Sequence, residues 1–226
     1  MKHHLLAILI VAAAGASAFA QTDADPPVIK KMQDLGTVYV TRRPVKKVKK
    51  DDDPRAVPGE KDQAPNAIIG IDFRPMAGTD SAKIAEVVKE LDTLPELETI
   101  LLLGQDVADD SIEALPASKK LLHVQFFNTQ ITDMGVAKLA RLPNLQTFKY
   151  TGMGLTDRGM EAIGKMKTLQ TIHVTDAKIG DKGVLALRGL VNLRRLNVEN
   201  TLASEESIEE LRAMLPRLNN IDRSLF

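Results

Sequence analysis

The chain has 226 residues, no cysteine and no tryptophan, and its 30 Lys and Arg residues are balanced by 30 Asp and Glu residues. The lack of cysteine excludes disulfides, so a stable domain must be held together by its packed core. The even charge and the few aromatic residues, 4% of the chain, argue against a nucleic-acid-binding protein, which needs basic and stacking surfaces.

Residues 1–20 have the composition of a secretory signal. Lys2 precedes an apolar run that extends from Leu5 to about Gly15, and Ala18-Phe19-Ala20 forms an A-x-A cleavage site. This order predicts cleavage after Ala20 and export to the periplasm or the medium. The alternative is a retained N-terminal anchor, although the run is short for a membrane span. An exported chain without cysteines or N-x-S/T acceptors favours a bacterial protein.

Residues 21–65 change in character, because six of the eleven prolines fall here and charges are dense. We expect a disordered tether, with a short extended piece at Thr37–Thr41. The tether holds a basic run at 42–50, followed by three aspartates at 51–53. One interpretation is a solvated linker whose charges largely cancel, and the other is contact with an anionic envelope polymer or lipid headgroups. The residues available for that contact are Arg42, Arg43, Lys46, Lys47, Lys49 and Lys50.

Residues 66–226 are built from repeats of 24 residues. An irregular first copy covers 66–96, and the regular copies begin at Leu97, Leu121, Leu145, Leu169 and Leu193. In each regular copy, positions 4 and 6 are apolar, which is strand spacing, and positions 16 and 19 are apolar, which is helix spacing. Each copy therefore predicts strand, turn, helix and turn. One unit cannot bury its own apolar face, so the copies must stack.

Position 13 of every copy is acidic: Asp109, Asp133, Asp157, Asp181 and Glu205. A column of carboxylates could hold a metal. We favour a structural role, in which each carboxylate accepts hydrogen bonds from free N–H groups at the start of its own helix. Gly135, Gly159 and Gly183 at position 15 would then lie in the first helical turn, and Asn144 and Asn192 at position 24 would suit the turn into the next strand.

The segment Ile131-Thr132-Asp133-Met134-Gly135-Val136 and its equivalents from Leu155 and Ile179 resemble the leucine-rich repeat family. The match is to the bacterial type with I-T-D-x-G-(V/L)-x-x-L, related to the cysteine-containing repeats of F-box proteins but without their cysteine. The resemblance implies an α/β solenoid of about six repeats, with parallel strands on the concave side and helices on the convex side. It also implies, in most cases, protein recognition.

Strand alternation sends positions 3, 5 and 7 outward onto the concave face. We expect a protein partner to dock there, with Leu101, Leu103 and Phe127 as an apolar anchor. The polar border of this predicted surface is formed by His123, Gln125, Lys149, His173 and Arg195. The alternatives are an ordinary solvated sheet, or an apolar patch that the tether covers.

No motif nominates an enzyme, because the sequence lacks a nucleophile–base pair, a phosphate loop and a zinc-binding motif. His123 and His173 are predicted to lie two strands apart, about 10 Å, which is too far for a shared metal. We therefore expect no cofactor and no metal. Two functions stay open: a module that binds a protein on its concave face, and an envelope-associated spacer held through the basic run at 42–50.

Overall fold

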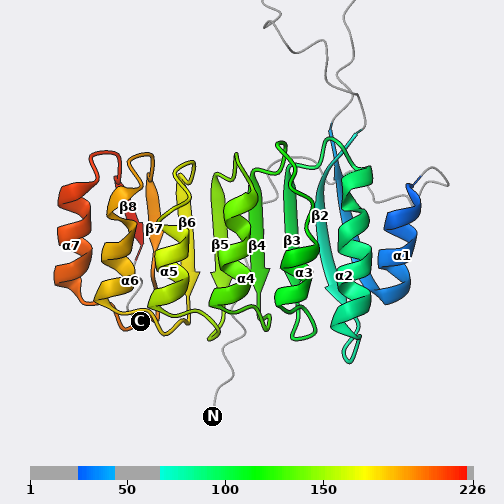
Figure 1. Ribbon diagram of the computed structural model, residues 1–226, viewed down its shortest axis with the longest axis horizontal. Coiled ribbons are helices and arrows are strands. Elements are labelled where there is room, and N and C mark those ends of the chain that lie inside the picture. The colour runs from blue at the N-terminus through cyan, green and yellow to red at the C-terminus, as the bar shows by residue number, and fades with distance from the viewer. Residues whose placement is uncertain (1–24, 44–66, 223–226) are drawn as a thin grey trace, which may run out of the picture.

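A computed structural model describes residues 25–43 and 67–222 of the chain. These residues form one eight-stranded sheet in sequence order, with the helices α2 to α7 along one face (Figure 1). The strands are β1 (Gly36–Arg42), β2 (Ile68–Pro75), β3 (Thr99–Leu103), β4 (His123–Phe127), β5 (Thr147–Thr151), β6 (Thr171–Thr175), β7 (Arg195–Asn197) and β8 (Asn220–Asp222). The helices are α1 (Pro27–Leu35), α2 (Ser81–Lys89), α3 (Asp109–Ala114), α4 (Asp133–Lys138), α5 (Asp157–Ile163), α6 (Asp181–Leu185) and α7 (Glu205–Met214), with 3-10 turns η2 (Glu90–Thr93), η3 (Leu139–Arg141) and η4 (Ala186–Gly189).

The strands β2 to β8 are parallel, and from β3 to β7 each residue faces the one 24 positions later. In β4, β5 and β6 the side chains at positions 4 and 6 are buried, and those at positions 3, 5 and 7 are partly exposed. Ile172, for example, is 0% exposed. The predicted solenoid is therefore confirmed, and in these three strands so are its inward and outward positions.

Thr132 and Thr156 at position 12 are the caps of α4 and α5, and their hydroxyls accept from the N–H groups of Met134 and Arg158. The expectation that the position-13 carboxylates cap their own helices is wrong for Asp133. Its two oxygens instead accept from the N–H and the hydroxyl of Thr156 in the next repeat, at 2.8 and 2.6 Å. The acidic column thus joins neighbouring repeats.

The same contact recurs along the stack. Asp109 accepts from the N–H and hydroxyl of Thr132, at 2.8 and 2.6 Å. Asp157 accepts from the N–H of Gly180, and Asp181 accepts from that of Ser204. Because these bonds repeat at each interface between the regular copies, they hold those copies in one register.

The fifth strand carries the largest fully buried side chain, that of Tyr150. Its hydroxyl donates to the carbonyl of Ile131 at 3.1 Å and accepts from the N–H of Gly154 at 2.9 Å. A Cβ on Gly154 would come 2.2 Å from that carbonyl, so the turn after β5 requires glycine there. Burial raises the pKa of the Tyr150 hydroxyl.

The prediction of a disordered tether over 21–65 is wrong for residues 27–42, which form a helix and a strand. Residues 27–35 form α1, and its Val28, Ile29 and Met32 are buried in the common core. The strand β1 follows immediately and pairs antiparallel with β2. Together α1 and β1 cover the open end of the stack, which is the role of a capping unit in a repeat protein (Figure 1). The predicted signal at 1–20 and the residues 44–66 lie outside the described part.

The other end of the stack is closed by α7, which is acidic on its exposed side. Ile208 and Leu211 of this helix are buried, whereas Glu206, Glu209 and Glu210 are exposed. The short strand β8 follows α7 and pairs parallel with β7. A polar outer face at each terminal repeat keeps the apolar ladder away from water.

Candidate functional site: the strand face

The outward side chains at positions 3 and 5 of the strands form two parallel rows that cross the sheet. The register places Gln125, Lys149 and His173 in direct succession at position 5, on β4, β5 and β6. Neighbouring strands lie about 4.8 Å apart, so each side chain in a row meets the next. The second row, at position 3, consists of Thr99, His123, Thr147, Thr171 and Arg195.

These two rows line a shallow depression of about 290 Å³. The structure therefore brings together the whole predicted polar border. Three threonines of the position-3 row, which the sequence analysis did not single out, complete the lining. The residues that line the depression are Thr99, His123, Gln125, Thr147, Lys149, Thr171, His173 and Arg195.

Lys149 and Arg195 supply the fixed positive charge of the depression, and none of its lining residues is acidic. Burial lowers the pKa of His123, and this effect outweighs the attraction of Glu98, while the charge of Lys149 lowers that pKa further. A lowered pKa keeps the His123 imidazole neutral at pH 7. It then offers one hydrogen-bond donor and one acceptor rather than a charge.

The predicted apolar anchor is smaller than expected. Leu101 and Phe127 are partly exposed on the strand face, but Leu103 is only 9% exposed and is buried. Phe127 stands directly beside Leu103 in the register. None of the three lines the depression. Leu103 and Phe127 lie at position 7, toward the ends of their strands, whereas Leu101 continues the position-5 row on β3, directly beside Gln125. The apolar residues therefore adjoin the depression at its β3 end.

Residues 165–187, which run from the loop after α5 through β6 into η4, match the family model described as Leucine Rich repeat. This match falls on the 24-residue unit that recurs throughout the sheet. The chain is a leucine-rich repeat protein. No curated protein matches it.

A crystal structure of a Bacteroides fragilis protein is similar to this leucine-rich repeat protein at 15% identity, with a TM-score of 0.40. The similarity covers 66% of this chain and 63% of that one, so the chain spans less than two thirds of that protein's length. The assignment to leucine-rich repeats rests on the repeats of this chain and on the family match.

A second depression, of about 350 Å³, lies where the loops of the leucine-rich repeat protein enter the strands. It is lined by Leu122, Asn144, Gln146, Thr168, Gln170 and Asn192. The amides at position 24 already have partners, since Asn144 Nδ2 donates to the carbonyl of Lys119 at 2.8 Å and Asn192 Nδ2 to that of Lys167 at 3.2 Å. These asparagines join neighbouring loops, which refines the turn role predicted for them.

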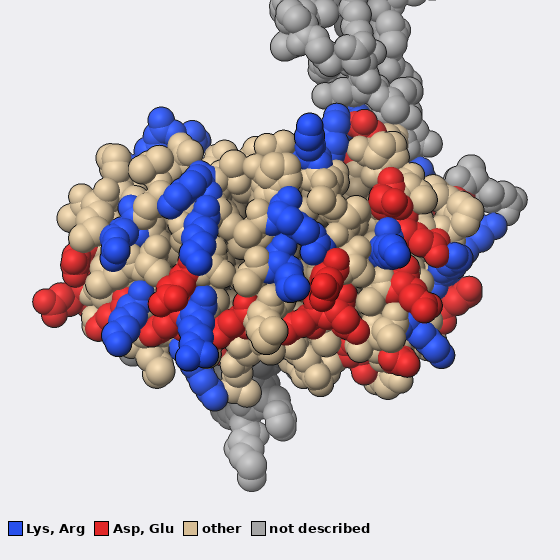
Figure 2. Space-filling model, in the orientation of Figure 1, with Lys and Arg blue, Asp and Glu red and all other residues tan. Residues whose placement is uncertain are grey.

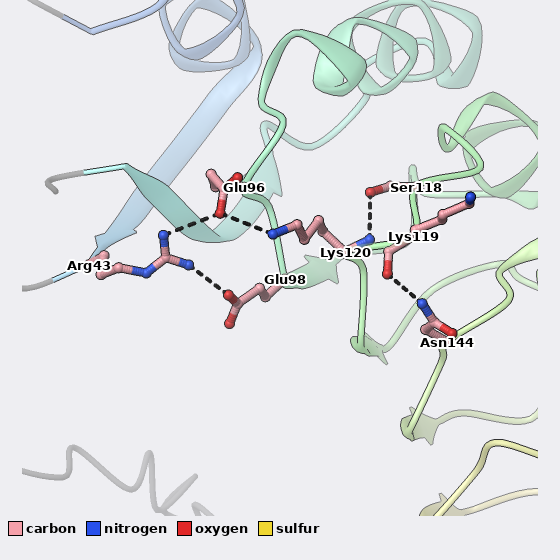
Figure 3. A network of polar contacts seen from close by, with 7 residues as sticks. All are labelled: Arg43, Glu96, Glu98, Ser118, Lys119, Lys120 and Asn144. Atoms are coloured by element: carbon pink, nitrogen blue, oxygen red, sulfur yellow. Dashed lines mark hydrogen bonds and ion pairs between the residues drawn. The ribbon is translucent and has the colours of Figure 1, made fainter. Parts of the chain in front are cut away.

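Two of the six residues predicted for polyanion contact lie in the described part, and both are ion-paired. Arg43 reaches Glu96 at 3.2 Å and Glu98 at 2.8 Å, and Lys120 approaches Glu96 at 3.5 Å from the next loop (Figure 3). Arg42 pairs with Asp25. The Arg43 side chain is 13% exposed, so its charge serves to fasten β1 to the loop before β3. Lys46, Lys47, Lys49 and Lys50 lie outside the described residues.

Within residues 25–43 and 67–222, no group of three His, Cys, Asp or Glu side chains is placed to hold a metal ion. The acidic column is engaged in the contacts between repeats described above. In the same part of the chain, no helix is both long and apolar enough to cross a membrane.

Proposed function

We propose that this chain is an exported bacterial binding module, without enzymatic activity, that holds a protein partner on its concave strand face. The observation that carries the proposal is the depression itself, which gathers charged and hydrogen-bonding side chains from the five strands β3 to β7. Most leucine-rich repeat domains bind proteins, which agrees with such a surface.

The packing beneath the depression supports binding without a large ordering cost. The inward neighbours Val124, Phe148 and Ile172 are each 0% exposed, so the strands that carry the site are fixed by the core. A site on rigid strands is already organised before a partner arrives. On the opposite face, Lys and Arg lie interspersed with Asp and Glu over the helices (Figure 2).

The test is crosslinked capture from the native envelope, with two variants that each introduce a tryptophan side chain. Thr147→Trp fills the depression from its floor and leaves the inward ladder intact, because Thr147 is an outward residue. Lys182→Trp adds the same side chain at an exposed position of α6. We expect the first variant to lose the captured protein and the second to retain it. If both variants capture the partner as well as the wild type does, the strand face is not the binding surface.

Export is the second part of the proposal and rests on the sequence of residues 1–20. Intact-mass measurement on protein recovered from the periplasm or medium tests it. A mass equal to that of residues 21–226 supports cleavage after Ala20. A mass equal to that of the full chain, with Met1–Ala20 retained, indicates an anchored form.

The alternative function, an envelope spacer held through the basic run, depends on Lys46 to Lys50. Deleting 44–50 should release a spacer from envelope fractions, and the release should depend on salt. The same deletion should leave capture on the strand face unchanged, so this experiment separates the two functions.

A further inference from the structure

We propose that the depression on the strand face recognises an extended acidic segment of the partner polypeptide. This inference rests on the function proposed above and adds the chemistry of the ligand. The lining consists of one lysine, one arginine, two histidines, three threonines and one glutamine, with no carboxylate. In a chain whose basic and acidic residues are equal in number, such a local excess of positive charge selects an anion.

The spacing of the two cations requires more than one carboxylate. Lys149 lies at position 5 of β5 and Arg195 at position 3 of β7, so they are two strands apart and offset by two residues. Strand spacing and residue rise place their Cα atoms about 12 Å apart. Residues i and i+4 on one face of an extended chain lie about 13 Å apart, so two acidic side chains of one segment reach both cations.

Polar side chains lie between the two charges. Thr171 and His173 stand on β6, between Lys149 of β5 and Arg195 of β7. The threonine hydroxyl donates to an acceptor without adding charge. A segment that lies across the strands therefore meets a cation, hydrogen-bonding side chains and a second cation in turn.

Acidic residues of this chain border the depression on both sides. Asp72 lies in the same row as Lys149 but on β2, three strands away. Burial raises the pKa of the Asp72 carboxyl, and the charge of Arg74 opposes that shift. Glu98 faces His123, and Glu199 follows β7 outside the lining. The cationic part of the face therefore ends where these carboxylates begin.

A polypeptide fits this place better than the other common polyanions. Lipid headgroups offer no backbone N–H or carbonyl groups, so they would leave the threonines and Gln125 between and beside the two cations without matching partners. Single-stranded nucleic acid would favour large stacking side chains, and no Phe, Tyr or Trp lines the depression. An extended peptide presents both carboxylates and backbone groups for the threonines and Gln125.

The experiment uses the mature chain and fluorescently labelled hexaglutamate at low salt, with hexaglutamine as the neutral probe. The test variant is Lys149→Ala/Arg195→Ala, and the matched control is Lys182→Ala/Arg188→Ala, which removes the same charge from exposed positions of α6 and η4. We expect hexaglutamate to bind the wild type and the control equally, the test variant at least fivefold more weakly, and hexaglutamine not at all.

Equal loss in the two double variants would mean that net charge, rather than the depression, attracts the peptide, and would overturn the inference. Binding of phosphatidylglycerol vesicles, but not of hexaglutamate, would overturn it in favour of a lipid surface. Circular dichroism melting of each variant verifies folding. If the test variant fails to fold, Lys149→Gln and Arg195→Gln replace it, since they keep most of each side chain.

The two proposals fail in different ways. If Thr147→Trp abolishes capture of the native partner while Lys149→Ala/Arg195→Ala leaves it unchanged, the strand face is the binding surface but its ligand is not acidic. If Thr147→Trp leaves capture intact while the hexaglutamate results hold, the depression binds acidic peptide and the native partner docks elsewhere.

Discussion

Gly159 lies directly against the carboxylate of Asp133 in the preceding repeat, and a Cβ on this glycine would come 2.5 Å from Asp133 Oδ1. The same relationship joins Gly135 to Asp109 and Gly183 to Asp157. The acidic column and the glycine column are therefore one feature, since the carboxylate that bonds to the next repeat occupies the space of a side chain there. Ser111 stands at the equivalent place in α3, where the preceding helix begins with Ser81 instead of an aspartate.

Gly159→Ala should lower the free energy of unfolding by about 1–3 kcal/mol, because the added methyl group overlaps the Asp133 carboxylate. Urea unfolding followed by circular dichroism measures the change. In the Asp133→Ala background the same substitution should cost clearly less, since the obstructing group is gone. Strictly additive effects in this double-mutant cycle would contradict the proposed contact.

Ile172→Asp should abolish cooperative thermal unfolding or lower the melting temperature severely. The side chain is fully buried between neighbouring repeats, so the substitution places an unpaired charge in the core. Thr171→Asp, one residue earlier on the outward face, is the control and should melt close to wild type. Similar melting of the two variants would show that the inward and outward positions are misassigned.

Ile29→Ala should destabilise the domain by about 2–4 kcal/mol, because this residue of α1 is 0% exposed and packs in the common core. Urea unfolding is again the measurement. Lys30→Ala, at the exposed neighbouring position, is the matched control and should change stability little. If Ile29→Ala unfolds like the wild type, residues 27–42 are a tether after all and not a cap.

Phe127→Ala should leave folding intact and weaken partner capture by about 2 kcal/mol, because the ring is partly exposed beside the polar rows. Capture is quantified by titrating the crosslinked partner, with Lys182→Ala as the control on the helix side. If Phe127→Ala captures the partner as tightly as the wild type does, the apolar patch is not part of the binding surface, which then consists of the depression only.

His123 should make stability depend on pH in a defined direction. Its pKa is lowered in the folded state, chiefly by burial, so below its usual value near 6.5 the unfolded chain binds the proton more readily. Stability contributed by this residue is therefore full above pH 6.5 and falls as pH drops through that value toward the folded pKa. His123→Gln should flatten the urea-midpoint profile in this window. A profile that matches wild type would show that His123 does not titrate there.

The sequence by itself determined the repeating unit and its faces. Apolar residues recur every 24 positions because each repeat makes the same contacts with its neighbours, so Ile172 was predicted inward and Lys149 outward, as the structure has them. The polar rows of the depression could be predicted for the same reason, since strand alternation and the repeat length place them side by side.

Only the tertiary structure decided what depends on contacts without a periodic signature. The cap at 27–42 offers one short amphipathic helix and one strand in a charged, proline-rich stretch, and its burial requires the end of the stack to be present. Asp133 was assigned to its own helix because local spacing says nothing about the neighbouring repeat, where its true partner Thr156 lies. Leu103 is buried for a related reason, since the exposure of an outward residue is set by what stands beside it in space.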